Sequence, residues 1–177
     1  MNSVWFAHGK ESGPRGRKIE ALSRVATALG WAMESPDYQG MDDPEARVAH
    51  LLECYQATSG KLVLVGSSMG GYVSLVAAQQ LAPEGLFLMA PALAMPGYAQ
   101  AEPELRAAQT LIVHGWRDAV VPPQNVISYA EARQIPLHLL DDDHPLGNSL
   151  RQLSSLFRDF LQEVAARPDA TRLAPHI

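Results

Sequence analysis

The sequence lacks the features that mark disulfide-stapled, membrane-spanning and nucleic-acid-binding proteins. A single cysteine among 177 residues excludes an internal disulfide framework. No apolar run approaches the roughly 20 residues that a membrane-spanning helix needs. With 14 Lys and Arg against 19 Asp and Glu, the net charge is −5, and no basic cluster is long enough to indicate a phosphate-binding face. We therefore expect neither a membrane nor a nucleic acid as a partner.

Motifs for phosphate-containing cofactors and for metal ions are missing as well. The chain has no Walker A motif and no Gly-x-Gly-x-x-Gly after a predicted strand, and residues 13–16 are interpreted as a turn that leads into a helix. No pair of histidines or carboxylates has metal-ligand spacing with supporting context, so we expect no metal and no cofactor. The N-terminus has no basic region followed by an apolar one, as a secretory signal would, so we expect a cytoplasmic protein.

What the sequence does contain is a regular alternation of short apolar runs and longer helix-period segments. The predicted strands cover residues 4–7, 31–34, 62–65, 86–89, 111–113 and 137–140, and the predicted helices residues 14–29, 44–57, 72–81, 122–133 and 148–166. Six strands that alternate with helices predict a parallel sheet covered by helices on both faces, a three-layer α/β/α fold. We expect one domain over residues 1–166 and a loose tail over 167–177.

The most informative motif is Gly66-Ser67-Ser68-Met69-Gly70, which joins a predicted strand to a predicted helix. A sharp strand-to-helix turn can hold a serine hydroxyl up and out, and crowding at such a turn explains the small residues around Ser68. The same turn places the N–H of Met69 at the start of a helix, where a developing oxyanion can be bound. The alternative is a glycine-rich turn that merely connects two elements.

Two more polar residues follow predicted strands. Asp118 comes shortly after the fifth strand and His144 follows the sixth, so both should lie at the carboxyl edge of the sheet with Ser68. We expect His144 to take the proton of the Ser68 hydroxyl and Asp118 to orient the imidazole. Asp118 could also be only a turn residue. Residues 141–143, three aspartates beside His144, are alternatives for the acid, but we interpret them as a solvated loop because adjacent residues seldom face one another.

The other nucleophilic or titratable candidates receive structural interpretations. His8 and His114 directly follow apolar strands, and we expect them to be buried and to shape the turns before Gly9 and Gly115. Cys54 lies in a helical pattern and is expected to fill space in the core or at its edge. The residue after Gly9 is Lys10, whose backbone N–H is the expected second donor to an oxyanion, beside that of Met69.

With these motifs in that order, the chain resembles the α/β-hydrolase superfamily, specifically its small single-domain serine esterases. The resemblance implies a six-stranded sheet in the order 2-1-3-4-5-6 that lacks the usual first two strands, because the His-Gly turn comes already at residue 8. The sequence departs from the family pattern at Asp143, where a glycine often precedes the catalytic histidine. Members of the superfamily cleave carboxylic esters and thioesters, and some cleave amides, lactones or carbon–carbon bonds.

The only irregular stretch is residues 92–109, which is too short for a lid domain. Leu93, Met95 and Tyr98 could line one wall of an acyl pocket, with residues 38–41 on another side, or Leu93 and Met95 could simply cover the sheet. We expect a cofactor-independent serine hydrolase that acts on a small or medium ester or thioester. The alternatives are a non-catalytic interaction protein on the same fold and a dienelactone-type hydrolase or peptidase.

Overall fold

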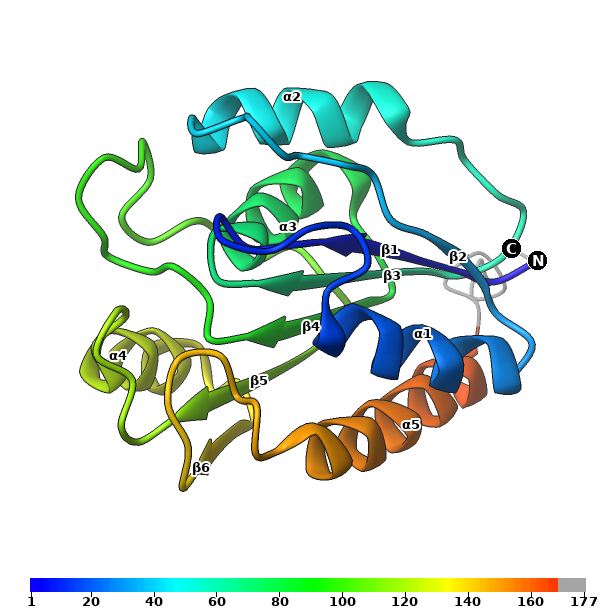
Figure 1. The fold of residues 1–177 in the computed structure, drawn as a ribbon. Coiled ribbons are helices and arrows are strands. Elements are labelled where there is room, and N and C mark those ends of the chain that lie inside the picture. The colour runs from blue at the N-terminus through cyan, green and yellow to red at the C-terminus, as the bar shows by residue number, and fades with distance from the viewer. Residues whose placement is uncertain (169–177) are drawn as a thin grey trace, which may run out of the picture.

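Six parallel strands form one sheet in the order β2-β1-β3-β4-β5-β6 in the computed structural model, which describes residues 1–168 (Figure 1). The strands are β1 (Ser3–Ala7), β2 (Ala32–Glu34), β3 (Leu62–Ser67), β4 (Gly85–Met89), β5 (Gln109–Gly115) and β6 (Leu137–Leu140). The helices are α1 (Arg17–Ala28), α2 (Pro44–Cys54), α3 (Met69–Leu81), α4 (Pro123–Arg133) and α5 (Leu150–Ala166). The fold class and the strand order expected from the sequence are confirmed.

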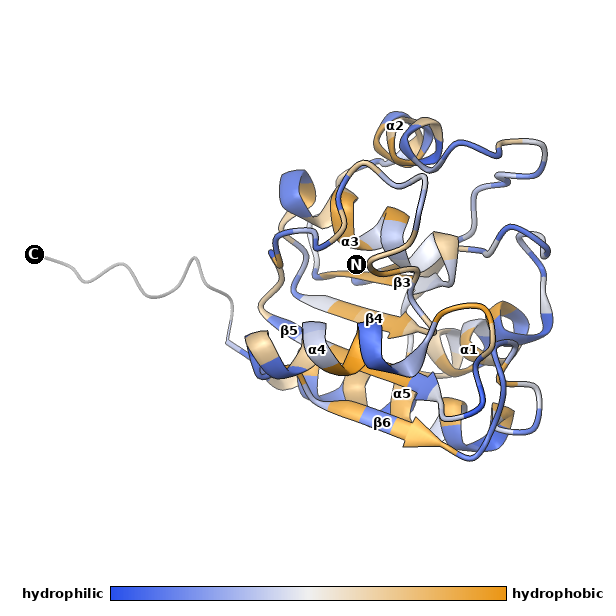
Figure 2. Cartoon of the chain, turned by 90° about the vertical axis from the view of Figure 1, so that its left-hand side faces the viewer, coloured by the Kyte–Doolittle hydropathy of each residue, from blue (hydrophilic) through white to orange (hydrophobic). Residues whose placement is uncertain are grey.

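Helices cover both faces of the sheet, and this explains why the central strands are apolar throughout. Residues of α1 and α5 share a core with Val63 and Val65, whereas residues of α2, α3 and α4 share the opposite core with Leu62 and Leu64. Successive side chains of a strand point to opposite faces, so a strand buried on both sides needs apolar residues at every position. Figure 2 shows the hydrophobic colour along the strands and the hydrophilic colour on the surface loops.

Element ends differ from the expected ones where the backbone changes direction. The first helix begins at Arg17 rather than at Pro14, because Gly16 is extended and forms its N-cap. Helix α2 ends at Cys54, three residues before the expected end, because Tyr55 is extended. Strand β3 continues beyond Val65 to Ser67, so that it ends directly before Ser68. These shifts leave the candidate residues at the strand ends where the sequence places them.

The C-terminal end of α5 is held by Lys61, the residue directly before the start of β3. Its ammonium donates to the carbonyl oxygens of Val164 at 2.8 Å, of Ala165 at 3.1 Å and of Arg167. Apart from Arg167 and Pro168, the expected tail of residues 167–177 lies outside the described residues. Within residues 1–168, every helix falls short of the length and apolarity that crossing a membrane requires.

Candidate active site

The carboxyl ends of the parallel strands meet at one edge of the sheet, and the candidate residues lie in the loops at this edge. Ser68 follows β3, Asp118 follows β5 and His144 follows β6, while the loop after β1 carries Lys10. The arrows of β1, β3 and β4 in Figure 1 all point toward this side. Parallel strands bring residues that are 76 positions apart in the chain, Ser68 and His144, within hydrogen-bond distance.

Ser68 sits in a strained turn that exposes its side chain. Its φ of 56° and ψ of −119° lie in a region that L-residues rarely occupy. The glycines around it are needed because the backbone passes closely: a Cβ on Gly66 would lie 2.2 Å from the carbonyl oxygen of Gly70, and a Cβ on Gly70 would lie 1.9 Å from that of Ala7. The structure thus gives the Gly-x-Ser-x-Gly pattern the geometry of a nucleophile turn.

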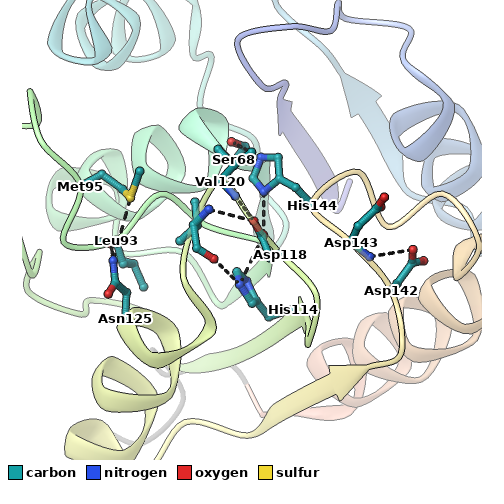
Figure 3. Close-up of polar contacts among 11 residues, drawn as sticks. Ser68, Leu93, Met95, His114, Asp118, Val120, Asn125, Asp142, Asp143 and His144 are labelled. Atoms are coloured by element: carbon teal, nitrogen blue, oxygen red, sulfur yellow. Dashed lines mark hydrogen bonds and ion pairs between the residues drawn. The ribbon is translucent and has the colours of Figure 1, made fainter.

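An uninterrupted chain of hydrogen bonds joins Ser68, His144 and Asp118 (Figure 3). His144 Nε2 lies 2.8 Å from Ser68 Oγ, and its Nδ1 lies 2.7 Å from Asp118 Oδ2. The Asp118 side chain is fully buried and that of His144 is 19% exposed. Since a carboxylate only accepts hydrogen bonds, the proton of a neutral His144 belongs on Nδ1, which leaves Nε2 free to accept from the serine hydroxyl.

Asp118 is held in place by its own loop. Its Oδ1 accepts from the N–H groups of Val120 and Val121, both at 2.8 Å. Its Oδ2, which faces His144, also lies 3.3 Å from His114 Nε2. The carboxylate therefore contacts the following turn and the imidazole at the same time, so its geometry is compatible with both interpretations of Asp118, as a turn residue and as the acid beside His144.

His114 is a contact of the site that the sequence analysis assigned only to a turn. Its ring is fully buried, and its Nε2 lies 3.0 Å from the carbonyl oxygen of Val121. Burial lowers the pKa of His114, so the ring is neutral near pH 7. Both neighbours of Nε2 are acceptors, which places the proton on Nε2 and directs it toward Val121 and Asp118. The signal in the sequence was the position of His114 at the end of the fifth strand.

The interpretation of residues 141–143 as a solvated loop is wrong for Asp142. Its side chain is 0% exposed, and it accepts hydrogen bonds from the N–H groups of Asp143 and Asn148 and from Ser149 Oγ at 2.7 Å. Burial alone would raise the pKa of Asp142, but these hydrogen bonds outweigh it and hold the pKa below its usual range. Figure 3 shows the Asp142 side chain directed away from His144.

Asp142 therefore binds both ends of the loop that carries His144. A glycine would be needed before the histidine only if that residue had a positive φ, and Asp143 does not. The residue of this loop with a positive φ is Leu146, at 55°. The departure from the family pattern at Asp143 thus leaves the imidazole in place. No local pattern indicated which of the three consecutive aspartates would be buried.

The two expected oxyanion donors lie where the first turn of α3 and the loop after β1 face the cavity beside Ser68. Within residues 1–168, the N–H groups of Met69 and Lys10 have no hydrogen-bond acceptor. The loop after β1 is fixed by Arg47, whose buried Nη1 donates to the carbonyl oxygen of His8 at 2.9 Å. Arg47 had no signal in the sequence beyond its place on a predicted helix. The same Nη1 also donates to the carbonyl oxygen of Gly9 at 3.4 Å, so Arg47 binds two successive carbonyl groups of this loop.

His8 is buried and fixes the same loop, as the sequence analysis expected. Its Nδ1 lies 2.8 Å from the carbonyl oxygen of Gly9, and its Nε2 accepts from the N–H of Tyr38 at 2.9 Å. Burial lowers the pKa of His8, so it is neutral with its proton on Nδ1. Tyr38 packs edge-on against the ring and is itself 0% exposed, and none of the expected residues 38–41 lines the cavity beside Ser68.

A cavity of about 450 Å³ opens beside Ser68 and His144. Tyr98 lines it, as expected, but Leu93 and Met95 are not among its lining residues. Leu93 is 1% exposed in the core, and Asn125 Nδ2 donates to its carbonyl oxygen at 2.9 Å. The cavity extends instead toward the start of α1 and the loop after His144. Most of its lining residues come from residues 8–12, 16–19 and 67–69 and from residues 144, 145, 147 and 150.

Metal-binding geometry is not found in this region. Within residues 1–168, no group of three or more His, Cys, Asp or Glu side chains is arranged to hold a metal ion. The side chains of the site instead contact one another, as His144 contacts both Asp118 and Ser68. The geometry thus provides a hydroxyl, a base and a buried carboxylate, an arrangement suited to nucleophilic attack on a carbonyl carbon.

Comparison with known proteins places the chain among hydrolases. Residues 3–106 match the sequence model of a family described as an uncharacterised protein family, UPF0227. A protein of Xanthomonas campestris pv. campestris assigned to the α/β superfamily of hydrolases is 37% identical, with a TM-score of 0.82, and the match covers 92% of this chain and 99% of that one. None of the curated proteins matches the chain in sequence.

More distant solved structures share the fold. Est1E from Butyrivibrio proteoclasticus is 16% identical with a TM-score of 0.78, over 94% of this chain and 89% of that one. An α/β serine hydrolase without a lid from Xanthomonas campestris is 21% identical with a TM-score of 0.72, over 94% and 84%. Within residues 1–168, this chain has no lid domain inserted into the fold either. It belongs to the UPF0227 family and, by its fold and its 37% identical relative, to the α/β-hydrolase superfamily.

Proposed function

We propose that the protein is a cofactor-independent serine hydrolase that cleaves a small or medium carboxylic ester or thioester through an acyl-enzyme on Ser68. The observation that carries this proposal is the unbroken hydrogen-bond chain from Ser68 Oγ through His144 to the buried Asp118. The hydrolase superfamily and the strained turn at Ser68 support the same interpretation.

The reaction follows from where the protons sit. Ser68 Oγ attacks the carbonyl carbon while its proton passes to His144 Nε2, and the imidazolium that forms is stabilised by Asp118. Collapse of the tetrahedral intermediate breaks the bond to the leaving group, which takes the proton from His144. Water then repeats the sequence on the acyl-enzyme, releases the acid and restores the serine hydroxyl.

The negative charge of the tetrahedral intermediate would be met by the backbone N–H groups of Met69 and Lys10. Neither donates elsewhere within residues 1–168, so both are available to an oxyanion. Donors of this kind contribute about 2.7–4 kcal/mol each to the transition state. They act through the backbone, so the identity of the Lys10 side chain does not enter this step.

The size of the cavity supports a small or medium acyl group. Its volume of about 450 Å³ lies in the lower part of the range for small-molecule sites, roughly 300–1,000 Å³. The part of the fold that residues 1–168 form has no lid domain that could close over a longer chain, and residues 92–109 are held by hydrogen bonds such as that from Gln100 N to Tyr72 Oη. Location in the cytoplasm and the absence of nucleic-acid and membrane partners stay predictions.

Labelling with a fluorophosphonate probe tests the nucleophile directly. We expect stoichiometric modification of Ser68 at neutral pH, and we expect Ser68→Ala to abolish both labelling and turnover of p-nitrophenyl butyrate, with kcat lowered on the order of 10⁴ to 10⁶. Ser74→Ala, on the same helix and away from the cavity, should label normally. Well-folded protein that neither reacts with the probe nor turns over the ester would overturn the proposal.

A further inference from the structure

The cavity beside Ser68 carries a charge opposite to that of the whole protein. The chain has 19 acidic and 14 basic residues, yet the side chains that line the cavity include Lys10, Arg17 and Lys18 and only one acid, Glu11. Cations concentrated in a cleft raise the local concentration of anionic ligands and orient them. The rest of the wall is largely apolar, with Ile19, Met69, Val120 and Leu150 among its residues.

Of the three basic residues that line the cavity, Lys18 is the most withdrawn from solvent. It lies in the first turn of α1, is only partly exposed, and makes no hydrogen bond or ion pair within residues 1–168. Burial lowers the pKa of Lys18 to about 8, against the opposing influence of Asp118, Asp142 and Asp143. An ammonium group has three donors and no acceptor, so a group in this position gains from an anion that accepts from it.

Three carboxylates act electrostatically on Lys18: Asp143 is exposed to solvent, and Asp118 and Asp142 already have other partners. Asp118 accepts from two backbone N–H groups and faces His144. Asp142 accepts from Asn148 and Ser149, among others. Neither carboxylate forms an ion pair with Lys18 within 4.0 Å, so both influence its ammonium group only by longer-range electrostatics. The side chain is thus not used up in holding the loops of the site.

The other two basic residues are less suited to hold a ligand. Lys10 lies 3.7 Å from Asp42, with both side chains at least half exposed. Arg17 is exposed, and its Nη1 lies 3.9 Å from where a Cβ on Gly147 would be, so it reaches across to the loop that carries His144. Both add positive potential at the mouth of the cavity, whereas Lys18 stands in its wall.

We propose that the substrate carries an anionic group, a carboxylate or a phosphate, and that Lys18 binds this group while the ester or thioester carbonyl lies at Ser68. The inference rests on the proposed function and narrows its substrate class. The apolar part of the wall would hold the carbon chain between the anion and the scissile bond. In a partly dehydrated cavity such a charge-assisted hydrogen bond is stronger than one at the surface.

Pairs of esters that differ only in charge test the proposal. On the acyl side, the pair is the p-nitrophenyl monoester of adipic acid and the mixed diester in which the free carboxyl group of that monoester is methylated. On the leaving-group side, it is 4-carboxyphenyl butyrate and its methyl ester. We expect the wild-type protein to prefer the charged member of one pair by about tenfold or more in kcat/KM, after subtraction of the uncatalysed rate. The pair that responds shows on which side of the scissile bond the anion lies.

Lys18→Met should remove that preference, because kcat/KM should fall about tenfold for the charged ester that responds and much less for its neutral partner. Arg24→Met is the matched control, because it removes the same charge from an exposed position of the same helix, and it should keep the preference. Equal losses on charged and neutral esters in Lys18→Met would overturn the inference and make Lys18 a counter-charge for the acidic loops.

The wild-type protein alone can also refute the inference, whatever the variant does. Turnover of the neutral esters together with probe labelling of Ser68, but no preference for either charged ester, would overturn the anion site and leave the serine hydrolase intact. No turnover and no labelling would instead defeat the proposed function itself.

Discussion

The turn that holds Ser68 and the loop that holds His144 reach the same site by different physical means. The turn at Ser68 is fixed by the backbone: it needs glycines at positions 66 and 70 because no Cβ fits there. The loop at His144 is fixed by one buried side chain, Asp142, whose carboxylate accepts hydrogen bonds from residues on both sides of the histidine. Steric exclusion leaves a recognisable sequence motif, whereas a side-chain network does not.

The two regions should therefore fail differently when they are changed. A backbone constraint is local and close to all-or-none, because the contacting atoms belong to the backbone of β1, α3 and the residue that follows β1. A hydrogen-bonded carboxylate contributes a finite free energy and can be weakened without loss of the fold. Substitutions in each region separate these two kinds of control.

The largest effect is expected for Gly70→Ala. The added methyl group would lie 1.9 Å from the carbonyl oxygen of Ala7 and 2.7 Å from that of His8, both in the backbone at the end of β1. We expect a loss of about 4 kcal/mol or more in the free energy of unfolding, or no folded protein, because neither neighbour can move without breaking the sheet. Chemical denaturation measures the loss.

Gly147→Ala is the matched control for that substitution. Its added Cβ would meet only Arg17 Nη1 at 3.9 Å, an ordinary contact, so the free energy of unfolding should stay within about 0.5 kcal/mol of wild type. A Gly70→Ala protein as stable as Gly147→Ala would show that the turn at Ser68 can relax and that the contrast between the two regions is false.

A smaller but still substantial effect is expected for Asp142→Asn. The change removes the charge and turns one acceptor into a donor that faces the N–H groups or the hydroxyl now bonded there. We expect a loss of about 2–3 kcal/mol in the free energy of unfolding. We also expect a tenfold or greater fall in kcat as His144 loses its position, with KM little changed.

Asp141→Asn provides the comparison on the neighbouring residue. The Asp141 side chain is 90% exposed and pairs with the exposed Arg117, so its replacement should change the free energy of unfolding by less than about 0.5 kcal/mol. Equal effects of the two substitutions would contradict the role of Asp142 in the loop. Far-ultraviolet circular dichroism of both variants should match wild type.

The contrast also explains what could be predicted from the sequence. The fold followed from the alternation of strand and helix patterns, and the position of Ser68 from a motif with a steric cause. Asp118 and His144 were found because each follows a strand end. Asp142 and Arg47 were missed, because the burial of one aspartate among three, or of one arginine on a helix, depends on tertiary contacts that leave no local pattern.

Leu93 and Met95, two of the three residues suggested for an acyl pocket, lie outside the wall of the cavity for a related reason. Leu93 and Met95 are apolar residues in an irregular segment, and such residues can cover the core or line a cavity with the same local sequence. Here they pack against the core beside α4, whereas the cavity lies toward α1. Only Tyr98 of the three lies in its wall. Arg17 and Lys18, at the start of α1, do line the cavity, but only the fold shows that they lie near Ser68.

The smallest effect, and the one that extends the comparison to pH, is expected for His114→Gln. The pKa of His114 is lowered in the folded protein, so below about pH 6.5 the unfolded chain binds a proton that the folded one does not. His114 thus makes the free energy of unfolding fall with decreasing pH, from about 6.5 down to its folded pKa, by up to about 1.4 kcal/mol per pH unit.

The substituted glutamine cannot titrate and can still donate to Asp118, so stability at pH 7.5 should change by less than about 1.5 kcal/mol. The decline in stability between about pH 6.5 and 5.5 should be shallower in the variant than in wild type. Urea unfolding at these three pH values measures both. An unchanged slope would mean that folding does not lower the pKa of His114, and a steeper decline in the variant would mean that the imidazole is a protonated counter-ion to Asp118 rather than a neutral donor.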